Sequence, residues 1–434
     1  MDLLGFCARI DTLLAMPSTV LFVLVGVFLT IKTRFIQIRA FSHFIKLLRS
    51  GVSHHHQKKE NMIDPLRALL TAMATTIGMG NIAGPSIAVV IGGPGALFWL
   101  VAYTFFGAVT KFSEVMFSIT LRKKLSDGNV LGGPTQYLKA IHPFLGMWYG
   151  AITVFLFAGW SGLQANTLAN VFYLEGVPTW ITGLVLASLV FLVLIGGVKR
   201  VGAIASKLVP LMFVLYVTFA SFILLKDISL LYKAFVLIGK HIFSPCAPIG
   251  GFLGATAFHA LKTGVHRNIY ITEAGLGTSS IAHAMADTDT PRDQAVLAMY
   301  SVIADMIPSI LSGLLVIVTG MWARSNEISS TLVYEVFRDY SNSFGKWILL
   351  ISISLFVLTT VIGNSFNASQ SFASFTRSRG MILYYLFLCV LIFLGALVSI
   401  PLAWKVMDVL LVMVAIPHLF GIIFLSFKYP QLIK

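Results

Sequence analysis

The sequence predicts an all-α polytopic membrane protein that forms a single integral membrane domain over residues 1–434. Hydrophobic residues make up 57% of the chain and charged residues only 11%, and the mean hydropathy is +0.88. Soluble domains carry about 25% charged residues, so most of this surface must face lipid. A helix needs about 20 apolar residues to cross about 30 Å of hydrocarbon, and the runs that reach this length predict about eleven transmembrane helices.

Each long apolar run is interpreted as one span, in chain order. The first, Pro17 to Ile31, has no basic flank before it and no small-residue cleavage site after it. It is therefore expected to be a true span and not a cleaved signal peptide. The other expected spans cover residues 66–91, 95–121, 145–173, 180–198, 204–226, 247–287, 293–323, 346–374, 381–400 and 404–427.

Two of these spans are interrupted by polar and helix-breaking residues. Gly78, Gly80 and Pro85 break the span at 66–91, and the segment Glu273–Gly277 helps to interrupt the span at 247–287. Interruptions in corresponding positions of two halves are the best sequence pointer to a binding site near the middle of the bilayer.

The interrupted spans also predict a repeat. With the first span set aside, one interrupted segment opens each group of five spans. Five is an odd number, so the second group enters from the opposite side of the membrane. The sequence therefore predicts two inverted repeats, over about residues 66–226 and 247–427, plus an extra N-terminal helix at about 17–31.

Basic residues predict the orientation of the chain. If the spans alternate, the following all lie on one side: Lys32, Arg34, Arg39, Lys46, Arg49, Lys58, Lys59, Arg122, Lys123, Lys124, Lys199, Arg200, Arg377, Arg379, Lys428 and Lys434. The positive-inside rule then places the N-terminus outside and the C-terminus in the cytoplasm of a plasma membrane, the inner membrane in a bacterium. The net charge of +14 is thus a topology signal and no nucleic-acid patch, and the lipid bilayer is the expected partner.

The first interruption has the composition of a substrate and ion site. Gly78 and Gly80 let a helix unwind, which frees amide N–H groups for an anion such as the carboxylate of an amino acid. The carbonyls released before them, on residues such as Ala74, Thr76 and Ile77, suit a hard cation, and Asn81 adds a side-chain oxygen. Two alternatives stay open: a kinked helix that packs closely through its glycines, and Asn81 as a cap of the second half-helix.

Further polar side chains lie inside otherwise apolar spans. The amide of Gln164 is costly at this depth unless it is paired, and it suits a carboxylate or an ammonium group; the alternative is a bond between helices. Thr359 and Thr360 offer hydroxyl oxygens to a sodium ion, although threonines in mid-helix more often bond to their own preceding turn.

Four ionisable residues lie in or near the membrane: Lys111, Glu114, Glu273 and Asp305. Each is a functional hypothesis by default, as an ion-pair anchor or part of a proton route. Lys111 and Glu114 are three residues apart on one helix face, and the favoured interpretation is that they pair with each other.

No nucleophile–base pair, phosphate-binding loop or Cys/His metal set is recognisable. An enzyme is therefore not expected, and neither is a cofactor other than sodium as a coupling ion. A channel is also disfavoured, since no ring of charges or filter-like repeat is present.

The chain resembles the alanine/glycine:cation symporters, a family that shares the fold of the bacterial leucine transporter. The resemblance rests on the segments Gly78–Gly84, Gly92–Trp99, Thr110–Glu114, Gly132–Pro134, Tyr137–Leu138, Gln164–Asn166, Glu273–Gly277 and Ile281–Ala284. It implies an importer of small neutral amino acids that couples alternating access to sodium symport. It further implies a carboxylate site at Gly78, Gly80, Asn81 and Gln164, and a sodium site at Ala74, Ile77, Thr359 and Thr360.

The sequence departs from the family at positions expected to line the pocket. Ile271 and Thr272 stand where the family has Ser-Asn, Asn364 replaces a tryptophan, and Phe366-Asn367 replaces an aromatic pair. We expect Thr272 and Asn364 to contact the substrate, with Asn364 enlarging the pocket or making it more polar. Another small polar solute, or coupling to protons, therefore stays open as an alternative.

Overall fold

The computed structural model of the chain describes residues 3–50, 62–124, 130–243, 257–324, 332–340, 342–376, 378–398 and 400–433. Its first half contains α1 (Leu3–Lys32), α2 (Ile36–Arg39), α3 (Phe41–Ser50), α4 (Pro65–Thr76), α5 (Met79–Gly92), α6 (Gly95–Thr120), β1 (Lys123–Lys124), β2 (Val130–Leu131), α7 (Pro134–Tyr137), α8 (Pro143–Tyr173), α9 (Thr179–Ile195) and α10 (Gly197–Leu225). Its second half contains α11 (Ile228–His241), α12 (Ala257–Thr272), α13 (Ser280–His283), α14 (Pro291–Val318), α15 (Met321–Arg324), α16 (Leu332–Tyr340), α17 (Asn342–Thr376), α18 (Met381–Leu397), α19 (Ile400–Lys428) and α20 (Pro430–Ile433). The short strands β1 and β2 pair antiparallel.

Among the described residues, six helices are long and apolar enough to cross a membrane: α6, α8, α10, α14, most of α17 and most of α19. The pair α4 and α5 makes a seventh span, bent by 42°. Three shorter apolar helices, Met16–Lys32 within α1, α9 and α18, coincide with further expected spans. The expected span at 247–287 is described only from Ala257, because residues 244–256 lie outside the described ranges. The all-α membrane architecture is confirmed, and the count of eleven stays a prediction.

Several helices begin where the sequence supplies a start signal. The Asp64 carboxylate accepts the Leu66 N–H at 2.9 Å, and Pro65 occupies the first turn of α4. Proline also opens α8 and α14, at Pro143 and Pro291. A carboxylate before the helix pairs an otherwise unpaired amide, and proline at this position needs no N–H partner, so these residues define where the spans begin.

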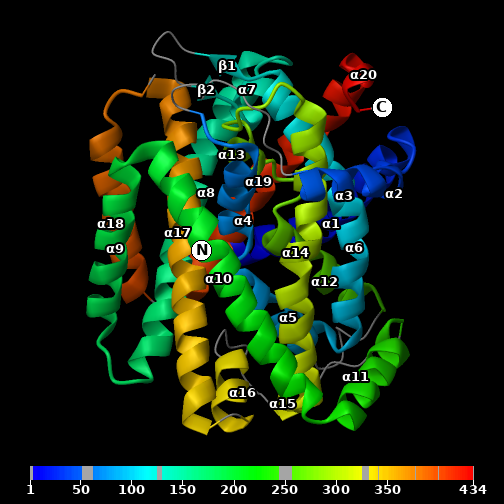
Figure 1. Ribbon diagram of the computed structural model, residues 1–434, viewed down its shortest axis with the longest axis vertical. Helices are drawn as coiled ribbons and strands as arrows, with labels where there is room; N and C mark the ends of the chain where they lie inside the picture. The colour runs from blue at the N-terminus through cyan, green and yellow to red at the C-terminus, as the bar shows by residue number, and fades with distance from the viewer. Residues whose placement is uncertain are drawn as a thin grey trace.

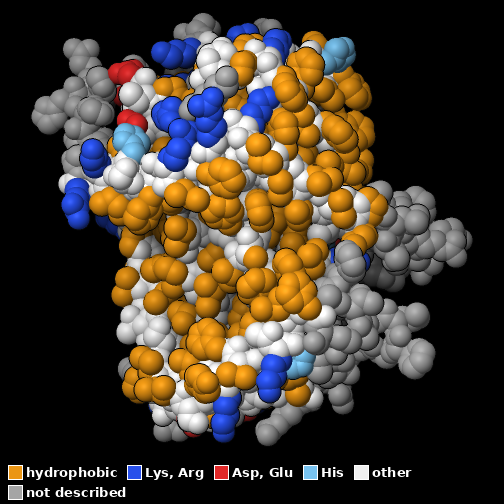
Figure 2. All heavy atoms as spheres, turned by 90° about the vertical axis from the view of Figure 1, so that its right-hand side faces the viewer, with side chains coloured by type: hydrophobic (Ala, Val, Ile, Leu, Met, Phe, Trp, Pro, Cys, Tyr) orange, Lys and Arg blue, Asp and Glu red, His pale blue; other side chains and the backbone are white. Residues whose placement is uncertain are grey.

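The basic segments gather at one end of the molecule. Figure 1 shows α2, α3, β1 and α20 at the same end, with α11, α15 and α16 at the other. Figure 2 shows Lys and Arg side chains above a broad band of exposed hydrophobic side chains. Such a band suits the hydrocarbon layer of a bilayer. Lys58, Lys59, Arg377 and Lys434, which also entered the orientation argument, lie outside the described residues. The side of the membrane on which this end lies stays a prediction.

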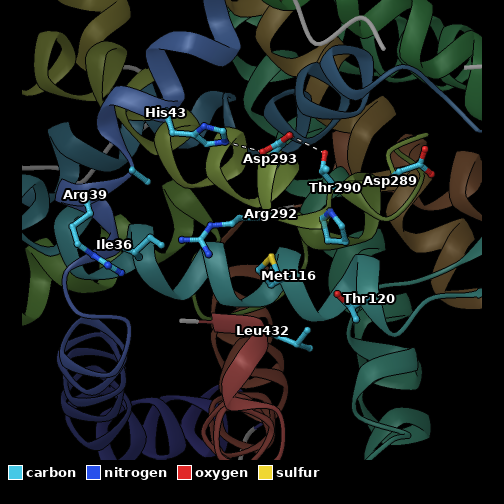
Figure 3. A pocket seen from close by; sticks show the side chains of 12 residues that line it. Ile36, Arg39, His43, Met116, Thr120, Asp289, Thr290, Arg292, Asp293 and Leu432 are labelled. Atoms are coloured by element: carbon cyan, nitrogen blue, oxygen red, sulfur yellow. Dashed lines mark hydrogen bonds and ion pairs between the residues drawn. The ribbon is translucent and has the colours of Figure 1, made fainter. Parts of the chain in front are cut away.

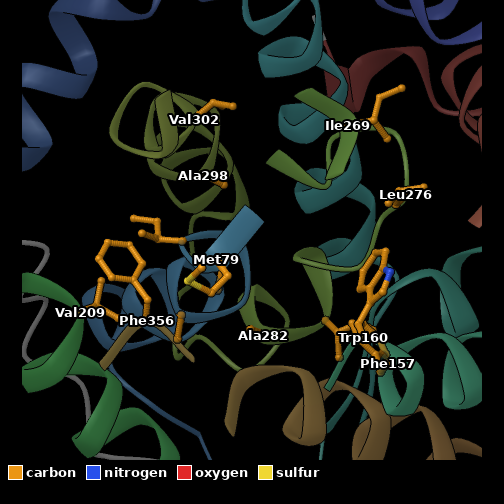
Figure 4. Packing of buried hydrophobic residues seen from close by; sticks show 14 of the residues in the cluster. Met79, Phe157, Trp160, Val209, Ile269, Leu276, Ala282, Ala298, Val302 and Phe356 are labelled. Carbon is orange, nitrogen blue, oxygen red and sulfur yellow. The ribbon is translucent and has the colours of Figure 1, made fainter. Parts of the chain in front are cut away.

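The bent pair α4–α5 lies in the interior of the bundle. α5 packs against α12 and α14, and α4 packs against α10 and α17, while α8 packs against α17, α18 and α19. Figure 4 shows buried side chains around the first turn of α5, with Phe356 and Val209 on one side of Met79 and Phe157 and Trp160 on the other. Rigid helices from both halves of the chain therefore surround the break.

Candidate functional site

The first break separates α4 from α5 at Ile77 and Gly78. The Gly78 N–H donates to the Asn81 side-chain oxygen at 2.9 Å, and the Asn81 amide nitrogen donates to the Asp305 carbonyl of α14 at 2.7 Å. Asn81 is fully buried. Its side chain thus caps the break and ties it to α14, which is the capping alternative left open by the sequence.

The second break separates α12 from α13, between Thr272 and Ser280. Glu273, Gly275 and Gly277 all have positive φ angles, of 55°, 92° and 75°. Glycine adopts this left-handed region without strain, whereas a glutamate there costs free energy that the surrounding structure must supply. Contacts with the surrounding structure, and not the backbone preference of glutamate, therefore determine this conformation of Glu273.

Side chains from α6, α8, α17 and α19 bind the backbone of this break. The Lys111 ammonium donates to Thr272 O at 3.3 Å, and Glu114 Oε1 accepts Gly275 N–H at 2.8 Å and Gly277 N–H at 3.1 Å. His418 bonds to Gly275 O at 2.8 Å, Tyr149 donates to Leu276 O at 2.7 Å, and the Asn367 amide donates to Thr278 O at 3.3 Å. A cation at the carbonyl end of α12 and an anion at the amides before α13 match the partial charges of helix ends.

Lys111 and Glu114 do not pair with each other as expected; the ion-pair partner of Lys111 is Asp305 of α14, with 3.5 Å between the ammonium nitrogen and a carboxylate oxygen. The reason is that their shared face of α6 is turned to the second break, whose unpaired backbone groups bind both charges. Asp305 also accepts the Thr76 hydroxyl at 2.9 Å. Lys111 and Asp305 therefore connect the first break with the second.

A cavity lies beside both breaks. It is lined by Thr75, Met79, Gly80, Ala83, Gly84, Ile87, Trp160, Leu163, Gln164, Thr167, Arg267, Tyr270, Glu273, Thr360 and Asn364. Of the residues singled out in the sequence as substrate or sodium contacts, the structure brings Gly80, Gln164, Thr360 and Asn364 to this cavity.

Several polar groups at the cavity have no partner in the protein. Gln164 Oε1, Asn364 Oδ1 and Trp160 Nε1 are buried without a hydrogen bond. The Glu273 side chain accepts the Thr278 hydroxyl but forms no ion pair with any described residue, although Glu273 is only 2% exposed. Burying polar groups without partners is costly, and so is burying a carboxylate without a direct ion pair. Their convergence on one cavity indicates that a ligand pairs them.

The first turn of α5 adds donors to this set. Amides in the first turn of a helix have no partner within the helix, and Met79 and Gly80 stand there at the cavity wall. A Cβ added to Gly80 would meet no atom closer than the Tyr270 carbonyl oxygen at 4.0 Å. The backbone of Gly80 is therefore open to the cavity, whereas a Cβ on Gly78 would collide with the Thr360 hydroxyl.

The helix α17 packs closely against the C-terminal end of α4. The Thr360 hydroxyl donates to Ile77 O at 3.2 Å, and a Cβ on Gly363 would lie 3.3 Å from the Ala74 carbonyl carbon. The Ala74, Ile77 and Thr360 oxygens thus belong to one contact between two helices. Thr359 is turned away from it: its hydroxyl donates to Leu355 O at 2.8 Å and lies 3.1 Å from the Met212 sulfur.

The expectation that Ile271, Thr272, Phe366 and Asn367 line the pocket is wrong, and the predicted substrate contacts Gly78 and Asn81 lie behind its wall. The Thr272 hydroxyl donates to Asn268 O at 3.0 Å and is fully buried, and Ile271 packs toward Gly84. The physical reason is that α12 ends at Thr272, so the chain turns and Glu273 is the residue that borders the cavity. Tyr270, Arg267, Thr75 and Trp160 also line it; their positions depend on helix packing that no local pattern reveals.

Comparisons with known proteins found a family and relatives that match most of the chain. Residues 4–434 match the sodium:alanine symporter family. The chain is 33% identical to the sodium/alanine symporter AgcS of Methanococcus maripaludis, covering 92% of this chain and 90% of the relative. It is 29% identical to the probable sodium/glutamine symporter GlnT of Bacillus subtilis, over 96% of this chain and 87% of the relative.

Solved structures share the fold. MhsT in complex with L-phenylalanine aligns with a TM-score of 0.63 at 14% identity, over 86% of this chain and 91% of MhsT. A Na+-coupled sialic acid symporter aligns with a TM-score of 0.58 at 13% identity, over 89% of this chain and 82% of that protein. The expected leucine-transporter-like fold is confirmed, while the boundaries of the repeats stay a prediction.

The buried pair between Lys111 and Asp305 yields a stability prediction. Lys111→Met is expected to lower the free energy of unfolding by about 3 to 5 kcal/mol, because it leaves a buried carboxylate without its cation. The double variant Lys111→Met with Asp305→Asn should recover much of this loss, since no unpaired charge remains. Thermal unfolding of purified protein in detergent measures both. A single variant as stable as the parent would show that the pair is not what holds the two breaks.

Proposed function

The chain belongs to the sodium:alanine symporter family and is a sodium-coupled membrane transporter, not an enzyme, and we propose that it imports a small neutral amino acid by alternating access. The observation that carries this proposal is the set of unpaired acceptors and donors around one cavity between the two breaks. A zwitterion supplies the complementary charges in a single small molecule.

The acceptors suit the ammonium group of an amino acid. An ammonium group has three N–H donors, and the cavity offers three acceptors from three elements: Gln164 Oε1 on α8, Asn364 Oδ1 on α17, and the Glu273 carboxylate in the second break. The donors suit the carboxylate, which would bind the amides of the first turn of α5 at Gly80, where the helix dipole also favours an anion. Gly78 and Asn81 would hold this turn in shape.

We place the sodium ion, as cargo, between the end of α4 and α17. Three oxygen atoms that can ligate a hard cation lie at this contact: the carbonyl oxygens of Ala74 and Ile77 and the hydroxyl oxygen of Thr360. Thr359 neighbours them on α17, although its hydroxyl is bonded to its own helix. An ion here would fix α4 against α17, while the substrate fixes α5. Both ligands would then stabilise the same geometry of one broken helix, which is a physical basis for coupling.

A neutral amino acid with a polar side chain is a second candidate. Asn364 and Trp160 leave an acceptor and a donor unpaired at the cavity, and a polar side chain can use them. The name of the relative GlnT, a probable sodium/glutamine symporter, is in keeping with such a cargo in this family.

The open side of Gly80 gives a test of the substrate site. Gly80→Leu is expected to abolish amino-acid uptake into proteoliposomes, because its Cβ would meet no atom closer than 4.0 Å and the rest of its side chain would occupy the cavity. The matched control is Gly239→Leu on α11, where a Cβ would also meet nothing within 4 Å. Both variants should fold, as judged by monodisperse elution. Uptake by Gly80→Leu equal to that of the control would rule out this cavity.

The sodium site is tested with near-isosteric changes. Thr360→Val removes the hydroxyl at the Ile77 carbonyl and should raise the sodium concentration for half-maximal substrate binding by about tenfold, a loss of about 1.4 kcal/mol. Thr359→Val should have a smaller effect, since its hydroxyl is committed to Leu355 O and Met212. Unchanged sodium dependence in both variants would overturn the assignment.

The ammonium site is tested at Glu273 and Asn364. Glu273→Gln removes the charge and Asn364→Leu removes the amide at similar volume, so each should weaken amino-acid binding by about tenfold or more. Thr153→Val on α8 serves as a control, because its buried hydroxyl bonds mainly within its own helix. Binding is measured with a radiolabelled amino acid at saturating sodium. Full affinity in both Glu273→Gln and Asn364→Leu would contradict an ammonium group at these acceptors.

A further inference from the structure

A second cleft lies far from the substrate cavity, at the basic end of the molecule. It measures about 670 Å³ and is lined by Ile36, Arg39, Ala40, His43, Met116, Thr120, Asp289, Thr290, Pro291, Arg292, Asp293 and Leu432. These residues come from α2, α3, the end of α6, the start of α14 and α20 (Figure 3). The transport site uses none of them.

Two guanidinium groups from separate elements face this cleft. Figure 3 shows Arg39 and Arg292 extending into it on either side of Ile36. One nitrogen of Arg39 donates to Thr33 O at 2.8 Å, which orients the side chain and leaves its other donors available. Arg292 has no partner among the residues that the structure describes. Paired guanidinium groups with free donors are suited to bidentate binding of a phosphate.

The acidic residues of the cleft are already matched by partners. Asp293 binds His43 at 2.7 Å and accepts the Thr290 hydroxyl at 2.8 Å. Asp289 lies near Arg122: burial lowers the pKa of the Arg122 guanidinium, and the charges of Asp287 and Asp289 oppose that shift. Arg39 and Arg292 therefore face the cleft without a carboxylate contact to neutralise their charge.

The wall of the cleft is an amphipathic segment formed by α2 and α3. Ile38, Phe41 and Leu48 are 62%, 53% and 53% exposed. On the inner side, the Phe44 ring stacks on Tyr300 of α14 with 4.5 Å between centroids. Exposed apolar side chains beside basic ones are typical of a helix that lies in the interfacial layer of a bilayer. The cleft thus opens where lipid headgroups meet acyl chains.

We propose that this cleft binds the phosphate of an anionic phospholipid through Arg39 and Arg292. Basic pockets between helices on the cytoplasmic side are suited to such headgroups. The apolar surfaces of Ile36, Met116 and Leu432 lie beside the arginines and suit the start of the acyl chains. The lipid would clamp the N-terminal segment to the start of α14, the helix that carries Asp305.

The test is native mass spectrometry of the full chain purified from mixed phosphatidylglycerol and phosphatidylcholine vesicles. The parent is expected to retain phosphatidylglycerol in preference to phosphatidylcholine. Arg292→Gln and the double variant with Arg39→Gln should weaken this retention by about tenfold or more, as loss of a charge-assisted bidentate contact implies. Arg292 is exposed and unpartnered, so its substitution should not affect folding.

Arg49→Gln is the matched control, because it removes an exposed arginine of α3 that does not line the cleft. Equal retention in the cleft variants and this control would show that only the general basic surface attracts lipid, which overturns the proposal. Added glycerol phosphate or inorganic phosphate should not displace the lipid at millimolar concentration. Displacement by either would identify the cleft as a site for free phosphate and would also overturn it.

Discussion

Backbone groups at bilayer depth must find partners inside the protein, and two charges on α6 meet this constraint for the second break. The Lys111 ammonium donates a hydrogen bond to the last carbonyl of α12, and the Glu114 carboxylate accepts hydrogen bonds from two amides before α13. Through Asp305 the same lysine reaches the first break. Fixed charges of the protein thus bind the backbone of the unwound segments. We propose that the polar groups left unpaired at the cavity bind the cargo.

The polar residues near the cavity are of two kinds: some are hydrogen-bonded within the protein and support the breaks, and others have polar atoms without a partner. Asn81 has its amide committed at both ends, to Gly78 and to Asp305. Gln164 and Asn364 have buried oxygens without partners. Glu273 belongs to both groups. Its backbone has a positive φ angle, and its carboxylate borders the cavity, accepts the Thr278 hydroxyl and is attracted by the Lys111 charge without a direct ion pair to any described residue. We propose that the ammonium group of the cargo supplies the direct partner that this buried carboxylate lacks.

The sequence predicts the breaks well and their partners poorly. Glycines and a proline within an apolar run locate the first break, because helix geometry is a local property. The rule that residues three apart pair on a helix fails for Lys111 and Glu114, since groups from α12, α14 and the second break bind them. Likewise Thr272 and Glu273 are neighbours, and only the end of α12 decides which one faces the cavity. Gln164 is predictable because an amide in mid-span is costly wherever it lies, and Asn364 is predictable only through the resemblance, where it replaces a tryptophan.

The central claim is that the cavity recognises both ends of a zwitterion in a sodium-dependent manner. The most direct test is equilibrium binding of one small amino acid, its decarboxylated amine and its hydroxy acid to the purified protein, in sodium and in choline. We predict that the amino acid binds strongly in sodium but not in choline. Both analogues should bind at least about a hundredfold more weakly in sodium, because each lacks one charged group and loses charge-assisted contacts of about 3 kcal/mol. Equal binding of the amino acid and either analogue, or equal binding in choline, would contradict the account.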